Sequence, residues 1–250
     1  MNVSAEPLLA LRNVEVRYPG GGAPAVTSAS FALSPGEIAV VVGSNGAGKT
    51  SLVRAIAGFL PSEGVTTRGS IRLAGREIRG KNPARLARSG LCFIPERNKV
   101  FRGLSVDQNL KLFGARRRSA GGLDDDLRLV FEMFPWMAER RGVLAGYLSG
   151  GEQQMLALSG AVLARPDLVI VDEPSLGLAP VIVQQVMQRL KMIRNEFGAS
   201  ILLVDQNVSG TVVIADRVFA MHVGDLVEED TTEVLRRAKA GGYARTEVQS

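Results

Sequence analysis

The chain is poor in the residues that build covalent and metal-based sites. It has one cysteine, one histidine and one tryptophan among 250 residues. A lone thiol, Cys92, excludes an internal disulfide framework and leaves too few sulfur ligands for a cysteine-based zinc site. The histidine, His222, falls in an expected late hairpin, where we predict an ordinary strand or turn residue.

Long apolar runs are missing as well. Residues 38–42, 168–171 and 201–204 are apolar, but each run is far short of the roughly 20 residues of a membrane-spanning helix. The N-terminal residues Met1–Glu6 lack the basic start and apolar core of a secretory signal. We therefore expect a soluble cytoplasmic protein.

Aromatic residues make up only 5% of the chain, too few for a platform that stacks single-stranded nucleic acid. The net charge of +5 fits either attraction to nucleic acid or an anionic membrane, or a solvated surface around a phosphate site. The second interpretation is favoured, because the one tight basic triplet, Arg116–Arg118, precedes small residues typical of an exposed loop.

Short strand patterns alternate with helical ones. The three apolar runs are of the kind buried in a parallel sheet, and helices are expected over about 49–59 and 180–197. A half-buried strand is expected over 9–18 and a closing hairpin over 217–229. The polar residues from Ala238 onward are expected to form a loose tail. The alternation predicts an α/β fold with a parallel sheet.

A phosphate-binding loop follows the first apolar strand. Its residues match G-x-x-x-x-G-K-[ST] throughout, with a strand before and a helix after: Gly43, Ser44, Asn45, Gly46, Ala47, Gly48, Lys49 and Thr50. Backbone N–H groups would wrap the phosphates, with Lys49 on the β and γ phosphates and the Thr50 hydroxyl on Mg²⁺. Ser51 is a candidate for the α phosphate. The pattern predicts nucleoside triphosphate binding.

Two carboxylates end the second apolar strand. Ligands of open α/β sheets bind at the carboxyl ends of strands, so Asp172 is placed to hold Mg²⁺ through a water. Its neighbour Glu173 can orient or deprotonate an attacking water. Alone, the pair is equally consistent with an acidic strand end; beside a matched phosphate loop, it predicts hydrolysis.

A second candidate phosphate site lies at residues 148–154, Leu-Ser-Gly-Gly-Glu-Gln-Gln. Ser149 offers a hydroxyl, and Gly150 and Gly151 let backbone N–H groups approach an anion. The apolar residues that follow suit a helix, whose N-terminus favours negative charge.

Together these motifs resemble the ATP-binding subunit of an ABC transporter over about residues 8–235. Further segments are similar to the ATPases of branched-chain amino acid importers, in particular the second of their two paired ATPases. These segments are Pro95–Arg97, Leu104–Val106 with Asn109-Leu110, residues 148–157, Asp172–Pro180 and Val204–Asn207. Urea and short-chain amide importers share much of this pattern.

The resemblance implies a RecA-like P-loop NTPase core with an antiparallel β subdomain and a helical subdomain inserted at about 97–160; residues 236–250 form the tail. It also implies that two ATPases stack head to tail, so that Ser149, Gly150, Gly151 and Glu152 bind the ATP held by the partner. Tyr18 would stack on adenine, although an edge-strand tyrosine is the alternative.

Two substitutions relative to most ABC ATPases fit the narrower subgroup. Glu96 stands where glutamine usually senses Mg²⁺, and a carboxylate can still ligate the ion. Gln206 replaces the switch histidine, and its amide can donate to the γ phosphate without titrating. With Glu173 and Lys49, Gln206 completes the expected catalytic set.

The implied protein is an ATP-hydrolysing importer motor on the cytoplasmic face of the inner or plasma membrane. Its cofactors are ATP and Mg²⁺. Its partners are a second ATPase, either different or identical, two membrane permease subunits and, indirectly, a solute-binding protein; no nucleic acid is expected. A soluble, non-transport ABC ATPase is a further alternative.

Two features depart from the family pattern, and one group of apolar residues has two possible interpretations. Gly160 replaces a common arginine, and the loop Gly177–Ala179 lacks the usual aspartate. Met133, Phe134 and Trp136 either line a groove for a permease helix or belong to the helical core.

Overall fold

The computed structural model describes residues 6–115 and 122–239. Its main sheet has six strands, all parallel except for the last hairpin. In spatial order they are β10 (Asp225–Glu229), β9 (Arg217–His222), β3 (Ile38–Val42), β8 (Ser200–Asp205), β7 (Leu168–Asp172) and β6 (Leu91–Ile94). The predicted parallel sheet is confirmed. Strand β6 was not predicted, because four residues with only their ends fully buried give no clear period.

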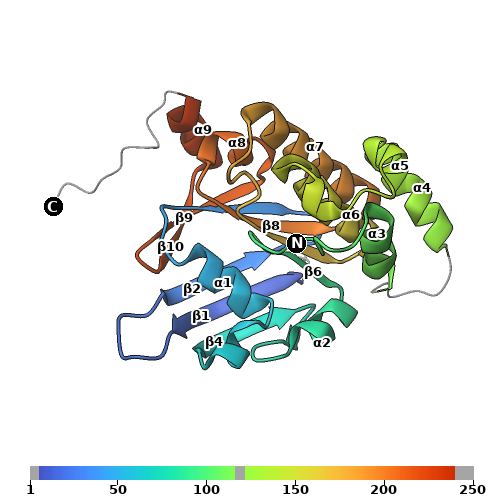
Figure 1. The fold of residues 1–250 in the computed structure, drawn as a ribbon. Helices are drawn as coiled ribbons and strands as arrows, with labels where there is room; N and C mark the ends of the chain where they lie inside the picture. The colour runs from blue at the N-terminus through green and yellow to red at the C-terminus, as the bar shows by residue number, and fades with distance from the viewer. Residues whose placement is uncertain (1–5, 116–121, 240–250) are drawn as a thin grey trace.

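A smaller antiparallel sheet lies below the main one (Figure 1). Its order is β2 (Val26–Leu33), β1 (Leu9–Arg17), β4 (Thr66–Leu73) and β5 (Arg76–Glu77). Strand β1 buries alternate residues in part, as the sequence pattern predicted.

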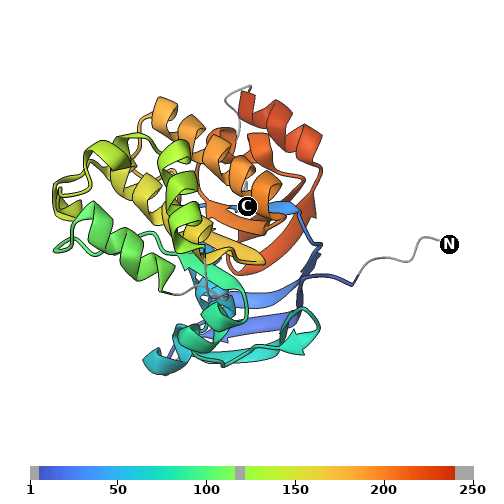
Figure 2. The ribbon, with the colours of Figure 1, turned by 90° about the vertical axis from the view of Figure 1, so that its right-hand side faces the viewer.

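One helix lies between the two sheets, another beside the antiparallel sheet, and most of the others above the main sheet (Figures 1 and 2). The helices are α1 (Lys49–Ile56), α2 (Pro83–Arg88), α3 (Val106–Gly114), α4 (Leu123–Met133), α5 (Trp136–Glu139), α6 (Gly150–Ala164), α7 (Pro180–Phe197), α8 (Val208–Thr211) and α9 (Thr231–Lys239). Short 3₁₀ turns are η1 (Leu60–Glu63), η2 (Ala145–Tyr147) and η3 (Val212–Ile214). Among the described residues, none of the helices has the length and apolar content to cross a bilayer.

The main sheet separates two hydrophobic cores. Along β3, Ile38, Val40 and Val42 face the core under α3 to α8, whereas Ala39 and Val41 face the core shared with α1 and the antiparallel sheet. Every residue of the strand is buried, which explains its continuous apolar sequence. As a result, α1 and α6 pack on opposite faces of the main sheet.

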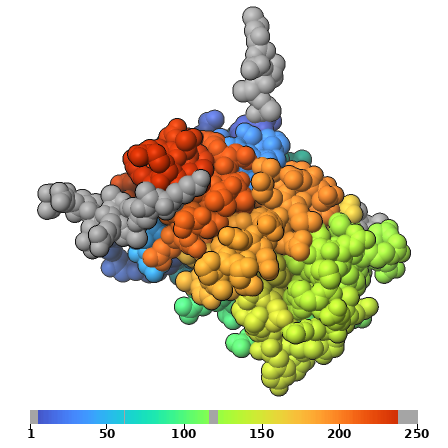
Figure 3. Space-filling view, turned by 90° about the horizontal axis from the view of Figure 1, so that it is seen from above, coloured from blue at the N-terminus to red at the C-terminus, as the bar shows by residue number. Residues whose placement is uncertain are grey.

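Helices α3 to α6 gather in one lobe beside α7 to α9 (Figure 3). Met133 and Phe134 are fully buried in this lobe and Trp136 packs partly against it. Met133 and Phe134 therefore belong to the helical core, and the alternative of a docking groove is wrong for these two residues. Trp136 is only partly buried.

The C-terminal end differs from the expected loose tail. Helix α9 reaches Lys239 and so takes in residues 236–239, and Val234 is fully buried against the main core. Leu235, next to Val234, packs partly against the same core, so two apolar residues anchor the helix. Because the residues around them are mostly polar, the sequence pattern did not indicate this anchor. Three other segments with expectations from the sequence lie outside the described residues: the rest of the expected tail, the Arg116–Arg118 triplet, and residues 1–5 of the N-terminal segment considered for a secretory signal.

Candidate nucleotide-binding site

Two glycines of the phosphate-binding loop are required by close backbone approaches. A Cβ at Gly43 would lie 2.4 Å from the Met221 carbonyl oxygen, and one at Gly48 would lie 2.1 Å from the Ala25 carbonyl oxygen. Gly48 also has a φ of 110°, which side chains rarely adopt, and it immediately precedes α1. The loop is thus fixed between β9 and the start of β2, with the α1 N-terminus behind it.

Lys49 is buried and folds back over the loop. Its Nζ donates to the carbonyl oxygens of Gly43 at 2.9 Å and Ser44 at 3.1 Å. The same ammonium lies 3.0 Å from Oε1 of Glu173. The structure therefore brings together the predicted phosphate ligand and the predicted general base as a buried ion pair.

Glu173 is held by the next strand. Its N–H donates to the Val204 carbonyl at 2.8 Å, and its Oε2 accepts the Gln206 N–H at 3.2 Å. Its φ is 47°, in the left-handed region that a non-glycine residue seldom adopts. Strained backbone of this kind clusters at functional sites, where surrounding contacts hold it in place.

Asp172 and Thr50 meet at the same edge of the sheet. The Thr50 hydroxyl donates to Asp172 Oδ1 at 3.0 Å. The pKa of Asp172 is raised to about 6, and burial is the main cause. The Thr50 hydrogen bond and the Lys49 charge oppose this rise, whereas the nearby charges of Glu173 and Glu96 add to it. A cation here would relieve that electrostatic cost.

The donor set fits Mg²⁺. Thr50, Asp172 and Glu96 supply hard oxygen ligands and line one pocket. In the described part of the chain, His, Cys, Asp and Glu side chains nowhere converge in threes on a metal position. Nucleotide phosphate oxygens would therefore have to complete the coordination.

Ser149 caps helix α6. Its Oγ accepts the Glu152 N–H at 3.3 Å and donates to Glu152 Oε2 at 2.8 Å, while the Ser149 N–H donates to the same Oε2 at 2.8 Å. Burial alone would raise the pKa of Glu152, but the Ser149 hydrogen bonds and the Arg140 charge outweigh it and lower that pKa. Glu152 thus contributes as a cap and as the partner of Arg140 at 2.7 Å.

The two glycines after Ser149 differ in their surroundings. A Cβ at Gly151 would lie 2.7 Å from Cγ2 of Ile182, so close packing with α7 requires glycine there. At Gly150 the nearest atom is 3.6 Å away, on Leu178, which leaves room at the α6 N-terminus. This end of α6 lies across the main sheet from the core that contains α1.

Tyr18 is 38% exposed at the end of β1, beside the start of α1. Its hydroxyl lies 3.2 Å from Ser51 Oγ. The contact brings the expected adenine-stacking residue next to the expected α-phosphate ligand.

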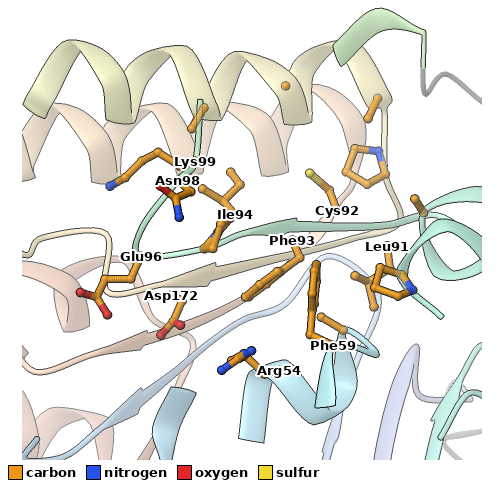
Figure 4. A pocket seen from close by; sticks show the side chains of 18 of the residues that line it. Arg54, Phe59, Leu91, Cys92, Phe93, Ile94, Glu96, Asn98, Lys99 and Asp172 are labelled. Atoms are coloured by element: carbon orange, nitrogen blue, oxygen red, sulfur yellow. The ribbon is translucent and has the colours of Figure 1, made fainter. Parts of the chain in front are cut away.

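A pocket of about 630 Å³ adjoins the cation position (Figure 4). The Glu96 and Asp172 carboxylates lie at one end; Phe59 and Phe93 lie side by side further in, with ring centroids 5.3 Å apart. Phe113 and Gly160 line the same pocket, and a Cβ at Gly160 would lie 3.3 Å from the Phe113 ring. Gly160 therefore lets the Phe113 ring lie against α6, which accounts for a glycine inside this helix.

Sequence reasoning missed a buried carboxylate beside the expected catalytic set. Asp205 ends β8 and accepts hydrogen bonds from the N–H and hydroxyl of Ser175 and from the Asn207 N–H. Burial raises the pKa of Asp205, and these hydrogen bonds partly oppose the rise. An acidic residue at the end of an apolar strand, directly before Gln206, was the available signal.

The chain matches the family model described as ABC transporter over residues 26–176. It is 36% identical over 228 residues to the high-affinity branched-chain amino acid transport ATP-binding protein BraG of Pseudomonas aeruginosa, covering 91% of this chain and 94% of that protein. It is 30% identical over 203 residues to the probable branched-chain amino acid transport ATP-binding protein LivF of Archaeoglobus fulgidus, covering 81% and 84%.

Solved structures of ATP-binding cassettes share the fold. The ADP conformation of MJ1267 matches with a TM-score of 0.77 at 21% identity, covering 97% of this chain and 100% of that one. A nucleotide-free cassette matches with a TM-score of 0.79 at 20% identity, with the same coverage. The fold and site thus define a P-loop ATPase of the cassette type. More particularly, the chain belongs to the ABC transporter family, as an ATP-binding subunit that hydrolyses ATP.

Proposed function

We propose that this chain is the motor subunit of an importer for branched-chain amino acids. The supporting observation is its similarity, over most of both chains, to two relatives named for that transport. Glu96 and Gln206, which fit the same subgroup, add support at the two positions where most ABC ATPases differ.

In this proposal ATP binds with its phosphates over residues 43–51 and its adenine against Tyr18. Lys49 exchanges its bond to Glu173 for phosphate oxygens, because the triphosphate carries more negative charge than a single carboxylate. Glu173 is thereby released within hydrogen-bonding reach of the Gln206 turn. Binding and activation of the base are thus linked through a single ammonium group.

Thr50, Asp172 and Glu96 would hold Mg²⁺ together with the nucleotide. The ion, when bound, neutralises charge on the phosphate oxygens. Asp172 contributes most effectively when ionised, so its raised pKa makes this function sensitive to mild acid.

Hydrolysis requires a water in line with the γ phosphorus. Glu173 accepts a proton from this water as its oxygen bonds to phosphorus, and the bond to the β–γ bridging oxygen breaks to give ADP and phosphate. The Gln206 side chain donates a hydrogen bond to a γ-phosphate oxygen. Its amide does not titrate near neutral pH, so it supplies this contact over a wide pH range.

Ser149 and Gly150 bind the γ phosphate of an ATP held by a second ATPase. The position of α6 across the main sheet from α1 supports this intermolecular assignment. We expect a partner ATPase of a different sequence, two permease subunits and an indirect link to a solute-binding protein, with the assembly on the cytoplasmic face of the membrane.

The test is reconstitution with the products of neighbouring genes. The tagged chain should copurify with two integral membrane proteins and a second ATPase. Proteoliposomes with the complete set should take up leucine, isoleucine or valine only when ATP is inside. Uptake of urea or a short-chain amide instead would assign the related importers, while recovery of nucleic acid and no membrane protein would contradict a transport role.

A further inference from the structure

The turns that carry Glu173 and Gln206 are joined by a side chain outside the expected catalytic set. Strands β7 and β8 are neighbours in the sheet, and each ends in one of these turns. Asp205, the last residue of β8, is 1% exposed and lies at this junction.

Three donors converge on the Asp205 carboxylate. Oδ1 accepts the Ser175 hydroxyl at 2.7 Å and the Asn207 N–H at 2.8 Å; Oδ2 accepts the Ser175 N–H at 3.1 Å. Ser175 follows Glu173 by two residues, and Asn207 follows Gln206 directly. The Asp205 carboxylate therefore links the turn that carries Glu173 to the turn that carries Gln206.

The Gln206 N–H closes the arrangement by donating to Glu173 Oε2 at 3.2 Å. Two side chains thus join the turns, that of Asp205 and that of Glu173 itself. Only the second link involves a group that must act on water, so it has to loosen during catalysis. The Asp205 link involves none of the proposed catalytic side chains and can persist.

We propose that Asp205 is a positioning residue that fixes the Glu173 turn relative to the Gln206 turn. The base and the amide then meet the γ phosphate in a constant relation after Lys49 has left Glu173. The inference rests on the proposed roles of Glu173 and Gln206. A carboxylate suits the position because both its oxygens only accept, whereas an amide would direct an N–H group at one of the three donors.

The experiment compares steady-state ATP hydrolysis by the reconstituted complex that carries Asp205→Asn with hydrolysis by the complex that carries the parent chain. We expect kcat to fall by about 10-fold or more, the effect of leaving a buried donor unsatisfied, while KM for ATP stays within about 2-fold. Asp126→Asn is the matched control, because Asp126 is an equally buried carboxylate, bonded to Arg165 in the helical lobe. It should lose stability without a selective fall in kcat.

Ser175 provides a second test that avoids changing the buried charge. Ser175→Ala should lower kcat by about 5-fold or more, and Ser175→Thr, which keeps the hydroxyl, should restore it. Ser159→Ala removes another buried hydroxyl, bonded to Leu156 away from these turns, and should leave kcat unchanged.

A kcat within about 2-fold of the parent in both Asp205→Asn and Ser175→Ala would overturn the inference. A fall in kcat that only matches the loss of folded protein, as expected for Asp126→Asn, would also overturn it. If Asp205→Asn does not fold, the Ser175 pair decides. Turnover by Glu173→Gln at the parental rate would refute the proposed site itself, whereas an inactive Glu173→Gln beside a fully active Asp205→Asn would refute only the positioning role.

Discussion

Replacing Glu173 by glutamine should stop turnover while strengthening ATP binding. The structure gives the reason: Oε1 of Glu173 lies 3.0 Å from Lys49 Nζ, so the carboxylate competes with phosphate for the ammonium. Glutamine has nearly the same shape but no charge. It can still accept the Gln206 N–H at the other oxygen position.

The two effects have different sizes. Loss of a general base lowers turnover by about 10²–10⁴-fold, or roughly 3–5 kcal/mol in activation free energy. The competing charged hydrogen bond contributes about 1.5–3 kcal/mol when intact, so its loss should lower the Kd for ATP by up to about 10–100-fold. Both groups are buried, so solvent screens the interaction little.

Phosphate release measures turnover, and titration calorimetry without Mg²⁺ measures ATP binding while hydrolysis is suppressed. Glu228→Gln is the matched control for binding, since that carboxylate pairs with Arg217 on the neighbouring strand rather than with Lys49. Parental turnover in Glu173→Gln would refute its role as base. A Kd raised by 10-fold would refute the competition between carboxylate and phosphate.

Three further predictions follow from other parts of the structure. As the pH falls from 7 through about 6, Asp172 takes up a proton that the unfolded chain, with the ordinary lower pKa, does not bind, so the free energy of unfolding should rise by up to about 3 kcal/mol near pH 4. Over the same range the affinity for Mg²⁺-ATP should fall. Asp172→Asn should flatten both pH curves, measured by thermal unfolding and by titration calorimetry. Ser149→Ala should lower the free energy of unfolding by about 1 kcal/mol, because the α6 cap is lost. It should also abolish the ATP-dependent association of two ATPases measured by light scattering, and unchanged association would exclude the serine from the shared site. Gly160→Val should collide with the Phe113 ring and lower the free energy of unfolding, measured with denaturant, by about 1–3 kcal/mol. Adding Phe113→Ala should recover part of this loss, and additive effects of the two changes would contradict the contact. The control Gly142→Val, at a position with open space around it, should have little effect.

The parallel core was predictable because its chemistry is local. Strands β3, β7 and β8 are buried on both faces and therefore have continuous apolar sequences. The phosphate loop was equally visible, because its glycines are required by the backbone at fixed spacing. Both signals lie within a few consecutive residues.

Contacts across the fold were not predictable in the same way. Strand β6 is defined by pairing with β7, not by its own four residues. Ser175 and Asp205 are 30 residues apart, and nothing in either neighbourhood specifies the other. Gly160 looked costly in a helix until the Phe113 ring, 47 positions earlier, supplied the reason for it.

The placement of α1 and α6 on opposite faces of the main sheet has a kinetic consequence. If each hydrolytic centre requires one end from each of two subunits, the two free ATPases, mixed in equal amounts, should show a rate that rises with the square of their concentration when dilute. Permease subunits that hold two ATPases close together would replace that dependence with a fixed effective concentration, typically in the millimolar range for short tethers. Unassembled subunits would then hydrolyse little ATP simply because they are dilute, and assembly on the permease would remove this limit.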